Sequence, residues 1–304
     1  MEAKTRKKRF VAVPSDATVE DSPALRLLLQ GLAKYRFLDS SHIERLTGWG
    51  GDYARRRLRE LFDAGFITKP KKQVRQLGQR YDIYTLDREG IRYLKTFASW
   101  DKLYLSRAHK ASSLPHKVTH GGNMAAFERS CMDQGTVRLI DTWEILDPVP
   151  DFKGTVGWTV DVHWKGEHFR LAINPDSLAG FHFLEAPEGK NRLYFVVETD
   201  LGTENEVRSN WHGTQTSIVR KLIPYLQTRE QGLLEPLFRI KKLKVFFIVN
   251  DEARIERIIR KCAAIEPRLV DPMFLFNTHE AVQKGNVLQI LWTDMMGNKV
   301  RIMT

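Results

Sequence analysis

Three acidic residues near the middle of the sequence have types and spacing that could support metal-dependent chemistry. Asp176 follows a proline just after a strand-like segment, and Glu198 and Asp200 stand at the end of the apolar run 192–198. Acids at the ends of neighbouring strands can converge, and carboxylate oxygens suit Mg²⁺, which also takes waters and substrate phosphate oxygens. Such a metal lowers the pKa of a bound water and stabilises charge during phosphodiester hydrolysis. The expected cofactor is therefore Mg²⁺, with Asp176 and Glu198 as its ligands.

The same acids also have an ordinary structural interpretation. Pro-Asp pairs are common in turns, and the stretch that begins at Asp200 could simply cap a loop. A buried Glu198 without a metal would be costly and would need hydrogen-bond partners. A third alternative stays open, in which the acids persist in a nuclease-like fold that does not cut.

The region around these acids has the pattern of an α/β domain with a mixed sheet. Alternating residues predict a hairpin over 158–173, and continuous apolar runs predict buried central strands. The expected strands are 137–145, 158–164, 168–173, 181–184, 192–198, 244–249, 273–276 and 288–292. The expected helices are 116–131, 214–226 and 252–264, and Pro224 must kink or end the second of them.

The net charge of +11 over 304 residues is concentrated in the first third of the chain. Residues 1–110 contain 24 Lys and Arg against 13 Asp and Glu, whereas the remaining residues contain 24 of each. This asymmetry predicts a basic module joined to a neutral one, and a polyanionic partner for the basic module.

Composition excludes several classes of protein. A content of 42% hydrophobic and 28% charged residues excludes a mostly disordered chain. The longest apolar run, 245–249, is far short of the ~20 residues that cross a bilayer, so no membrane partner is expected. Cys131 and Cys262 cannot form a zinc knuckle or a disulfide framework, which makes a reducing cytoplasm the expected compartment.

The first third has the layout of a winged helix-turn-helix. Helices are expected at 23–36, 41–46 and 52–64, with Ser22, Ser41 and Asp52 as their N-caps. In such a motif the basic third helix enters the major groove of DNA. A hairpin with a basic tip follows it and forms the wing, and a fourth helix begins near Asp87. The expected DNA contacts are Arg55, Arg56, Arg57, Arg59, Lys69, Lys71, Lys72, Arg75 and Arg80.

A solvated helix face is the alternative interpretation of the arginine run. The run coincides, however, with the basic hairpin and with the charge bias of the whole segment. Phosphate contacts by these residues would make DNA affinity fall with salt whatever the base sequence.

The acidic motif resembles the PD-(D/E)XK nuclease core. Pro175-Asp176 followed by Glu198-x-Asp200 on an apolar strand matches that pattern, and the resemblance implies a restriction-endonuclease-like α/β fold that binds Mg²⁺ through the Asp and the Glu. The sequence departs from the pattern because Asp200 occupies the usual lysine position. Lys221 is then a candidate for a lysine that has migrated to the following helix, and Glu128 resembles the extra acid on the preceding helix.

The two halves together resemble bacterial replication-relaxation family proteins. The resemblance rests on four motifs, Arg55–Ile67, Tyr84–Gly90, Pro175-Asp176 and Glu198–Glu204, and spans roughly residues 22–260. Proteins of this family occur on plasmids and other mobile elements and are linked to DNA replication or transfer. The expected organisation is a tail at 1–21, a winged helix-turn-helix at 22–108, a linker at 109–115 and a nuclease-like domain at 116–304.

These observations predict a DNA-binding protein of a plasmid or other bacterial mobile element whose second domain hydrolyses DNA phosphodiesters with Mg²⁺. In that mechanism Asp200 is an auxiliary acid and Lys221 orients the attacking water. The alternative is a non-catalytic transcriptional regulator or replication and transfer accessory factor with a degenerate nuclease fold. The expected partner is double-stranded DNA, and a second copy of the chain or an accessory protein stays open as a further partner.

Overall fold

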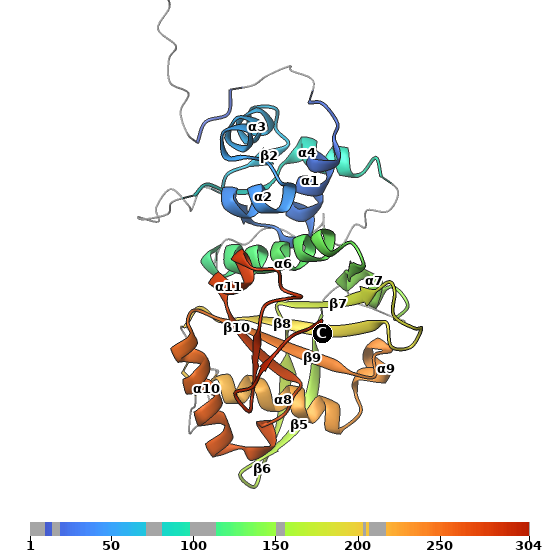
Figure 1. Cartoon of the computed structure of the whole chain (residues 1–304), viewed down its shortest axis with the longest axis vertical. Helices are drawn as coiled ribbons and strands as arrows, with labels where there is room; N and C mark the ends of the chain where they lie inside the picture. Colours follow the sequence, from blue (N-terminus) through green and yellow to red (C-terminus); the bar gives the residue numbers. More distant parts are fainter. Residues whose placement is uncertain are drawn as a thin grey trace, which may run out of the picture. The chain divides into compact units, whose positions relative to one another are not determined.

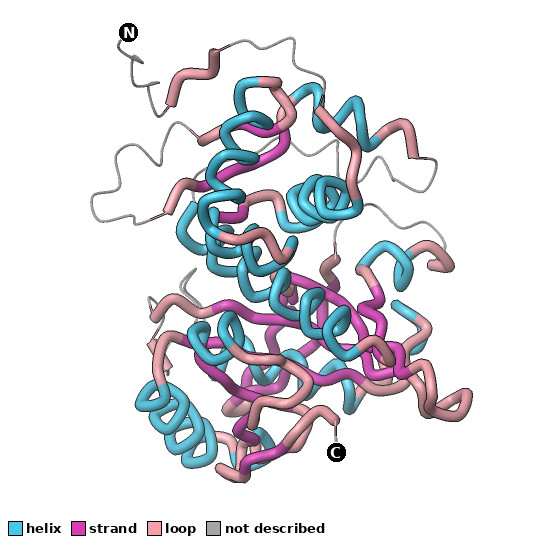
Figure 2. Tube along the Cα trace, turned by 45° about the horizontal axis from the view of Figure 1, so that its top comes forward, coloured by secondary structure: helices cyan, strands magenta, loops and turns pink. Residues whose placement is uncertain are grey.

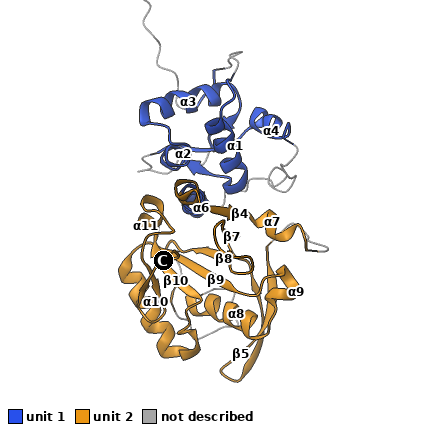
Figure 3. Ribbon diagram, turned by 45° about the vertical axis from the view of Figure 1, so that its right-hand side comes forward, with its two compact units in different colours: residues 1–129 blue, residues 130–304 orange. Residues whose placement is uncertain are grey.

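The chain forms two compact units, 1–129 and 130–304, which Figure 3 colours blue and orange. The computed structural model describes residues 10–13, 19–70, 81–97, 114–149, 156–202, 205–206 and 217–303. The boundary between the units falls within α6 (Leu114–Gln134). Most of the linker expected at 109–115 lies outside the described residues, and its last two residues already belong to α6.

The first unit combines helices with a small antiparallel sheet of order β1-β3-β2. Strand β3 lies in the middle, with Tyr84 opposite Leu38 of β1 and Leu86 opposite Ile67 of β2. The elements are α1 (Pro23–Tyr35), β1 (Leu38–Asp39), α2 (Ser40–Thr47), α3 (Gly51–Asp63), β2 (Ile67–Thr68), β3 (Ile83–Leu86) and α4 (Arg88–Leu94). The described part of the unit therefore contains the expected helices and the two strands of the expected hairpin.

Leucines of α1 form much of the core of this unit. Leu25, Leu28, Leu29 and Leu32 recur at helical spacing and are at most 1% exposed. The helix begins as expected, because the Ser22 side chain accepts the Leu25 backbone N–H and a proline follows at the first helical position.

Two of the expected N-caps are wrong. Asp39 caps α2 in place of Ser41, because its carboxylate accepts the backbone N–H of His42 over 2.9 Å and so starts the helix earlier. Gly50 precedes α3 without a side-chain cap. Asp52 lies inside the first turn of that helix, and its carboxylate pairs with Arg55.

The second unit is built on a seven-stranded mixed sheet of order β12-β11-β10-β9-β8-β7-β4. Strands β8, β9 and β10 are parallel, and their other neighbours pair antiparallel. Figure 2 shows these strands side by side in magenta. They are β4 (Val137–Ile140), β7 (Ser177–Phe183), β8 (Arg192–Thr199), β9 (Leu243–Val249), β10 (Phe274–Thr278), β11 (Trp292–Asp294) and β12 (Lys299–Val300).

Helices and a separate hairpin cover one face of this sheet (Figure 1). The hairpin consists of β5 (Trp158–Trp164) and β6 (Glu167–Ile173), as the alternating pattern predicted. Its inner side chains pack with those of the helices and of β8 and β9 in one apolar core. The helices of this unit are α7 (Thr142–Leu146), α8 (Ile218–Glu230), α9 (Leu234–Phe238), α10 (Glu252–Ile265), the 3-10 turn η3 (Pro267–Leu269) and α11 (His279–Lys284).

A row of buried aromatic rings runs across several strands of the sheet. Phe181, Phe195, Phe246 and Trp292 come from four adjacent or nearby strands, with successive ring centroids 4.7, 4.9 and 4.6 Å apart. All four side chains are fully buried. Contacts of this kind fix strand register because a one-residue slip would turn each ring to the other face.

Several expected elements of this unit differ in the structure. The strand expected at 181–184 already begins at Ser177, as β7. The strand expected at 137–145 ends at Ile140, because Asp141 and Glu144 form a capping box that begins α7. Helix α8 ends at Glu230, four residues beyond the expected end. Of the two expected effects of Pro224, it does not end the helix, since the burial of the apolar face outweighs a cost of about 3 kcal/mol for an interior proline. The last expected strand, at 288–292, begins only at its final residue, where β11 starts.

Among the residues that the structure describes, no helix is both long and apolar enough to cross a membrane.

Candidate functional site

The candidate site lies where β7 begins and β8 ends. In this antiparallel pair Ser177 is opposite Val197. Asp176 directly precedes Ser177, and Glu198 directly follows Val197. The Thr199 backbone N–H also donates to Asp176 Oδ2 over 2.8 Å, which holds that carboxylate beside the end of β8. The fold thus brings together the two acids that the sequence analysis assigned to Mg²⁺.

Helix α8 supplies a tyrosine and a lysine to Glu198. Tyr225 Oη donates to Glu198 Oε1, and Lys221 Nζ lies 3.8 Å from Glu198 Oε2. Both side chains reach the carboxylate because residues four apart share one face of a helix. The Glu198 side chain is 8% exposed and that of Lys221 is 26% exposed. The acid is therefore nearly enclosed, whereas the lysine stays accessible from solvent.

Tyr225 is a fixed donor at this site. Burial raises the pKa of its hydroxyl well above the ordinary value, and the negative charges of Glu198 and Asp176 raise it further. The hydroxyl therefore stays protonated and can hold one oxygen of Glu198 in place.

Asp200 has a different set of partners. Arg254 Nε, from the first turn of α10, donates to Asp200 Oδ2. The Gly202 backbone N–H donates to Asp200 Oδ1 over 3.0 Å, so both carboxylate oxygens have a protein donor. The side chains of Asp200 and Arg254 are only 2% and 7% exposed. This buried ion pair joins the end of β8 to the beginning of α10.

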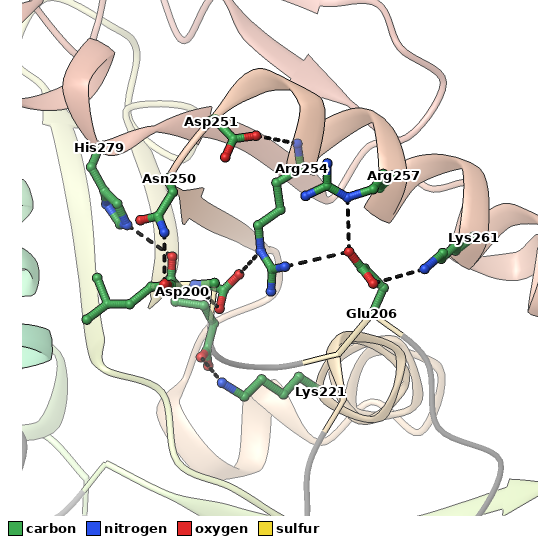
Figure 4. Close-up of polar contacts among 12 residues, drawn as sticks. Asp200, Glu206, Lys221, Asn250, Asp251, Arg254, Arg257, Lys261 and His279 are labelled. Atoms are coloured by element: carbon green, nitrogen blue, oxygen red, sulfur yellow. Dashed lines mark hydrogen bonds and ion pairs between the residues drawn. The ribbon is translucent and has the colours of Figure 1, made fainter.

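Glu206 extends the ionic network along α10, as Figure 4 shows. Its carboxylate lies 3.2 Å from Arg257 Nε, 3.0 Å from Lys261 Nζ and 3.6 Å from Arg254 Nη1. Burial would raise the pKa of Glu206, but hydrogen bonds from Lys261, the backbone and Arg257 outweigh it and lower that pKa to about 2. Because the Glu206 carbonyl also accepts the Val219 backbone N–H, this short segment is fastened to both α8 and α10.

The donor set at the end of β8 fits a hard divalent cation. Asp176 and Glu198 both offer oxygens, and Mg²⁺ is usually held by one or two carboxylates together with waters and substrate phosphates. Within the described part of the chain, no group of three or more His, Cys, Asp or Glu side chains could hold a metal ion. Mg²⁺ at this position would therefore need waters or phosphate oxygens to complete its coordination.

The four arginines of α3 differ in exposure. The side chains of Arg55 and Arg56 are 74% and 70% exposed, and their acidic partners lie on the same helix. Those of Arg57 and Arg59 are 14% and 22% exposed. Arg57 donates to the carbonyl of residue 20 over 2.8 Å, and Arg59 donates to the carbonyl of residue 11 over 2.9 Å. The second pair of arginines thus ties the segments that precede α1 to α3.

The basic hairpin is described at its base. The Lys69 side chain is only 6% exposed, and its ammonium pairs with Asp82 over 2.9 Å. The rings of Phe62 and Tyr84 also lie 5.1 and 5.3 Å from that ammonium. Lys69 thereby links the end of one hairpin strand to the beginning of the other. The remaining basic residues expected at the tip, Lys71, Lys72, Arg75 and Arg80, lie outside the described residues.

Glu128 of α6 is engaged within the first unit. Lys34 Nζ donates to one of its carboxylate oxygens over 2.7 Å, and Tyr35 Oη donates to the other over 2.5 Å. These contacts attach α6 to the end of α1, and both oxygens of Glu128 have a donor there.

Sequence reasoning missed Tyr225, Arg254 and Glu206. A signal for Tyr225 was present, because it stands four residues after Lys221 and so shares its helix face. Arg254 is one of several charged residues in an amphipathic helix, and no local pattern distinguishes the one that is buried. Glu206 reaches its cations only through contacts between segments about fifty residues apart, which no spacing rule reveals.

Comparison with known proteins gives one match. A family model described as Replication-relaxation matches residues 29–238, which include the α3 arginines, Asp176, Glu198 and Lys221. Searches of curated proteins and of solved structures gave no significant match. Because the matched segment covers more than half of the sequence, the chain belongs to the replication-relaxation family.

Proposed function

We propose that this protein binds double-stranded DNA through a winged helix-turn-helix in its first unit and hydrolyses DNA phosphodiesters at a PD-(D/E)XK-like centre in its second. Membership of the family suggests a role in replication or in the transfer of a mobile element. The observation that carries the proposal is that Asp176 and Glu198 lie together at the end of β8, with Lys221 beside Glu198.

The first unit supports the DNA-binding part of the proposal. Helices α2 and α3 follow each other across a short glycine-rich turn, and an antiparallel strand pair follows α3. In a helix-turn-helix the second of two such helices enters the major groove. Arg55 and Arg56 of α3 then supply exposed positive charge to phosphates or base edges.

Four residues of the second unit have different roles in the proposed hydrolysis. Asp176 and Glu198 would hold Mg²⁺, which supplies a Lewis acid and a more acidic water when bound. Tyr225 donates to Glu198 Oε1 and so orients that carboxylate. Lys221, partly exposed beside Glu198 Oε2, orients the attacking water and adds positive charge near the scissile phosphate.

Asp200 has a supporting part in this proposal. Its two oxygens accept hydrogen bonds from Arg254 and from the backbone of Gly202. These bonds make Asp200 a link between the end of β8 and α10. This assignment replaces the auxiliary-acid role that the sequence motif suggested for Asp200, and it leaves Lys221 as the basic residue of the centre.

The test is cleavage of duplex, nicked and single-stranded DNA in Mg²⁺ or Mn²⁺ by the full chain. Wild type should cut at least one substrate, and Asp176→Ala and Glu198→Gln should abolish cutting. Lys221→Met should slow it by about 10²–10³-fold, the usual effect of removing one preorganised donor. Lys284→Met, which changes an exposed lysine of α11, is the matched control and should cut like wild type.

Cutting that survives both acid substitutions would contradict the assignment of the site. The absence of cutting on every substrate, with DNA binding retained, would favour a second candidate function. That candidate is a non-catalytic regulator or accessory factor, and the observation that favours it is the buried pairing of Asp200, at the usual lysine position, with Arg254.

A further inference from the structure

Two aromatic side chains stand beside the exposed arginines of α3. Trp49 precedes the helix and Tyr53 lies in its first turn, and their rings meet edge to face with centroids 5.8 Å apart. Tyr53 is 47% exposed. The Arg56 guanidinium lies 5.5 Å from the centroid of that ring. These three residues form one surface, which we call the aromatic edge of α3.

The backbone beside the aromatic edge is open. A Cβ placed on Gly50 or Gly51 would meet no other heavy atom within 4 Å. Both glycines are exposed, and Gly50 offers no side chain that would shield the start of the helix. A flat ligand can therefore approach the rings without meeting a neighbouring side chain at these two positions.

The combination of rings and cations indicates the ligand. Phosphate contacts by arginines do not distinguish one base or one pairing state from another. An exposed aromatic ring adds a stacking surface for a base that has left the duplex stack, and such stacking tolerates any base because every base has a π-face. A single exposed hydrophobic residue needs no explanation, but here the exposed ring of Tyr53 lies together with the half-buried ring of Trp49 and a guanidinium on the basic unit.

We propose that Trp49 and Tyr53 stack on an unpaired base of DNA while Arg55 and Arg56 contact the adjoining phosphates. This inference rests on the proposed DNA binding by α3 and adds a substrate class to it. The preferred DNA contains a bulge, a gap or a junction between double and single strands. The preference over a perfect duplex should be about 5- to 150-fold, the range that one stacked base provides.

The experiment measures binding of the full chain to three DNAs of one sequence. These are a perfect duplex, a duplex with a single bulged 2-aminopurine, and the single strand, each followed by fluorescence anisotropy. Wild type should bind the bulged duplex more tightly than the perfect one and should quench the 2-aminopurine by stacking on it. Tyr53→Ala should remove the preference and the quenching while it changes affinity for the perfect duplex less than about threefold.

Two variants separate the ring from other effects. Tyr53→Phe keeps the ring and should keep the preference. Tyr81→Ala removes another exposed tyrosine of the same unit, 39% exposed, and should also keep it. Circular dichroism of each variant confirms that the fold is retained, which exposure of Tyr53 leads us to expect.

Equal affinity of wild type for bulged and perfect duplexes would overturn the inference while DNA binding by α3 stands. A preference that survives in both Tyr53→Ala and Trp49→Ala would overturn it in the same way. Failure of wild type to bind any of the three DNAs would overturn the proposed function and the inference together. Loss of preference in Tyr53→Ala alone, with Tyr53→Phe unaffected, supports it.

Discussion

Helix α3 and the interior beside β8 use charged side chains in opposite ways. On α3, Arg55 and Arg56 are 74% and 70% exposed and have acidic partners only a turn away. Beside β8, Asp200 and Arg254 form a pair whose side chains are 2% and 7% exposed. Exposed pairs contribute about 0–1 kcal/mol, but removing one member of a buried pair leaves the other charge uncompensated. Substitutions should therefore change binding in the first region and folding in the second.

The contrast also separates two kinds of electrostatic action. Exposed arginines act on a polyanion at a distance, and salt screens them beyond about 10 Å. The buried ions of the second unit act on their immediate neighbours, where screening is weak. The first arrangement suits capture of DNA in many registers, whereas the second fixes the position of one strand end. Four predictions test this difference.

The largest effect is expected from breaking the buried pair. Arg254→Met removes the partner of Asp200 and should lower the free energy of unfolding by about 3–5 kcal/mol. Urea denaturation of the full chain measures it. Arg268→Met, which removes a 50% exposed arginine paired with Glu266, is the matched control and should cost less than about 1 kcal/mol. Equal losses in the two variants would show that burial does not decide the outcome.

Glu206 gives the buried network a dependence on pH. Its pKa is lowered from 4.5 to about 2 in the folded state, so the unfolded chain binds more protons between these values. The stabilisation is complete above pH 4.5 and is lost as the pH falls towards 2. Glu206→Gln should lower the free energy of unfolding by about 1–2 kcal/mol near pH 6, since solvent around Arg257 and Lys261 screens part of the gain.

Urea denaturation of Glu206→Gln and wild type from pH 6 down to pH 2 checks this prediction. The difference between them should shrink through pH 4 and be mostly lost near pH 2. Glu256→Gln alters an exposed glutamate on the same helix and should have little effect throughout. A difference for Glu206→Gln that stays constant over the whole range would rule out the carboxylate as its source.

Local patterns in the sequence predicted the elements whose partners are close along the chain. The leucines of α1, its Ser22 cap and the 158–173 hairpin all depend on neighbours within one helix or one hairpin. Competition between local signals produced the errors, as where Asp39 and Ser41 both offered a cap for α2 and the earlier one was used. Helix α8 does not end at Pro224, because its burial in tertiary structure outweighs the local cost of the proline.

The candidate site was predictable in part for the same reason. The sequence analysis expected Asp176 and Glu198 to meet, and the hydrogen bond from Thr199 holds Asp176 beside the end of β8. The route differs from the expected one, because the strand before Asp176 belongs to the separate hairpin and Asp176 lies where β7 begins. The partner of Asp200 was not predictable, because Arg254 follows it by 54 positions and only the parallel order of β8 and β9 brings α10 there. The exposure of each α3 arginine could not be predicted from the sequence either, since it depends on where the segments before α1 lie.

A smaller effect is expected on DNA affinity. Replacing Arg55 and Arg56 by alanine together should weaken binding to duplex DNA about tenfold and reduce the slope of log K against log salt by up to about 1.8, since each phosphate contact contributes about 0.9. Fluorescence anisotropy titrations at salt concentrations between roughly 50 and 200 mM measure this slope. The free energy of unfolding should change by less than about 0.5 kcal/mol because both side chains are exposed. An unchanged slope would place the DNA contacts elsewhere.

The smallest effect sharpens the comparison within one helix. Arg57→Ala removes a 14% exposed side chain that donates to the carbonyl of residue 20, and it should lower the free energy of unfolding by about 1 kcal/mol. The slope with salt should stay that of wild type. Arg56→Ala should instead reduce the salt slope and leave the free energy of unfolding nearly unchanged. Both residues are arginines of α3 with Glu60 as an acidic neighbour. Side-chain chemistry and helix are the same in the two variants, so a difference between them isolates exposure as the cause. A reduced salt slope in Arg57→Ala would mean that this arginine leaves its partner before α1 to contact DNA. The distinction between exposed arginines that bind DNA and less exposed ones that stabilise the fold would then be wrong.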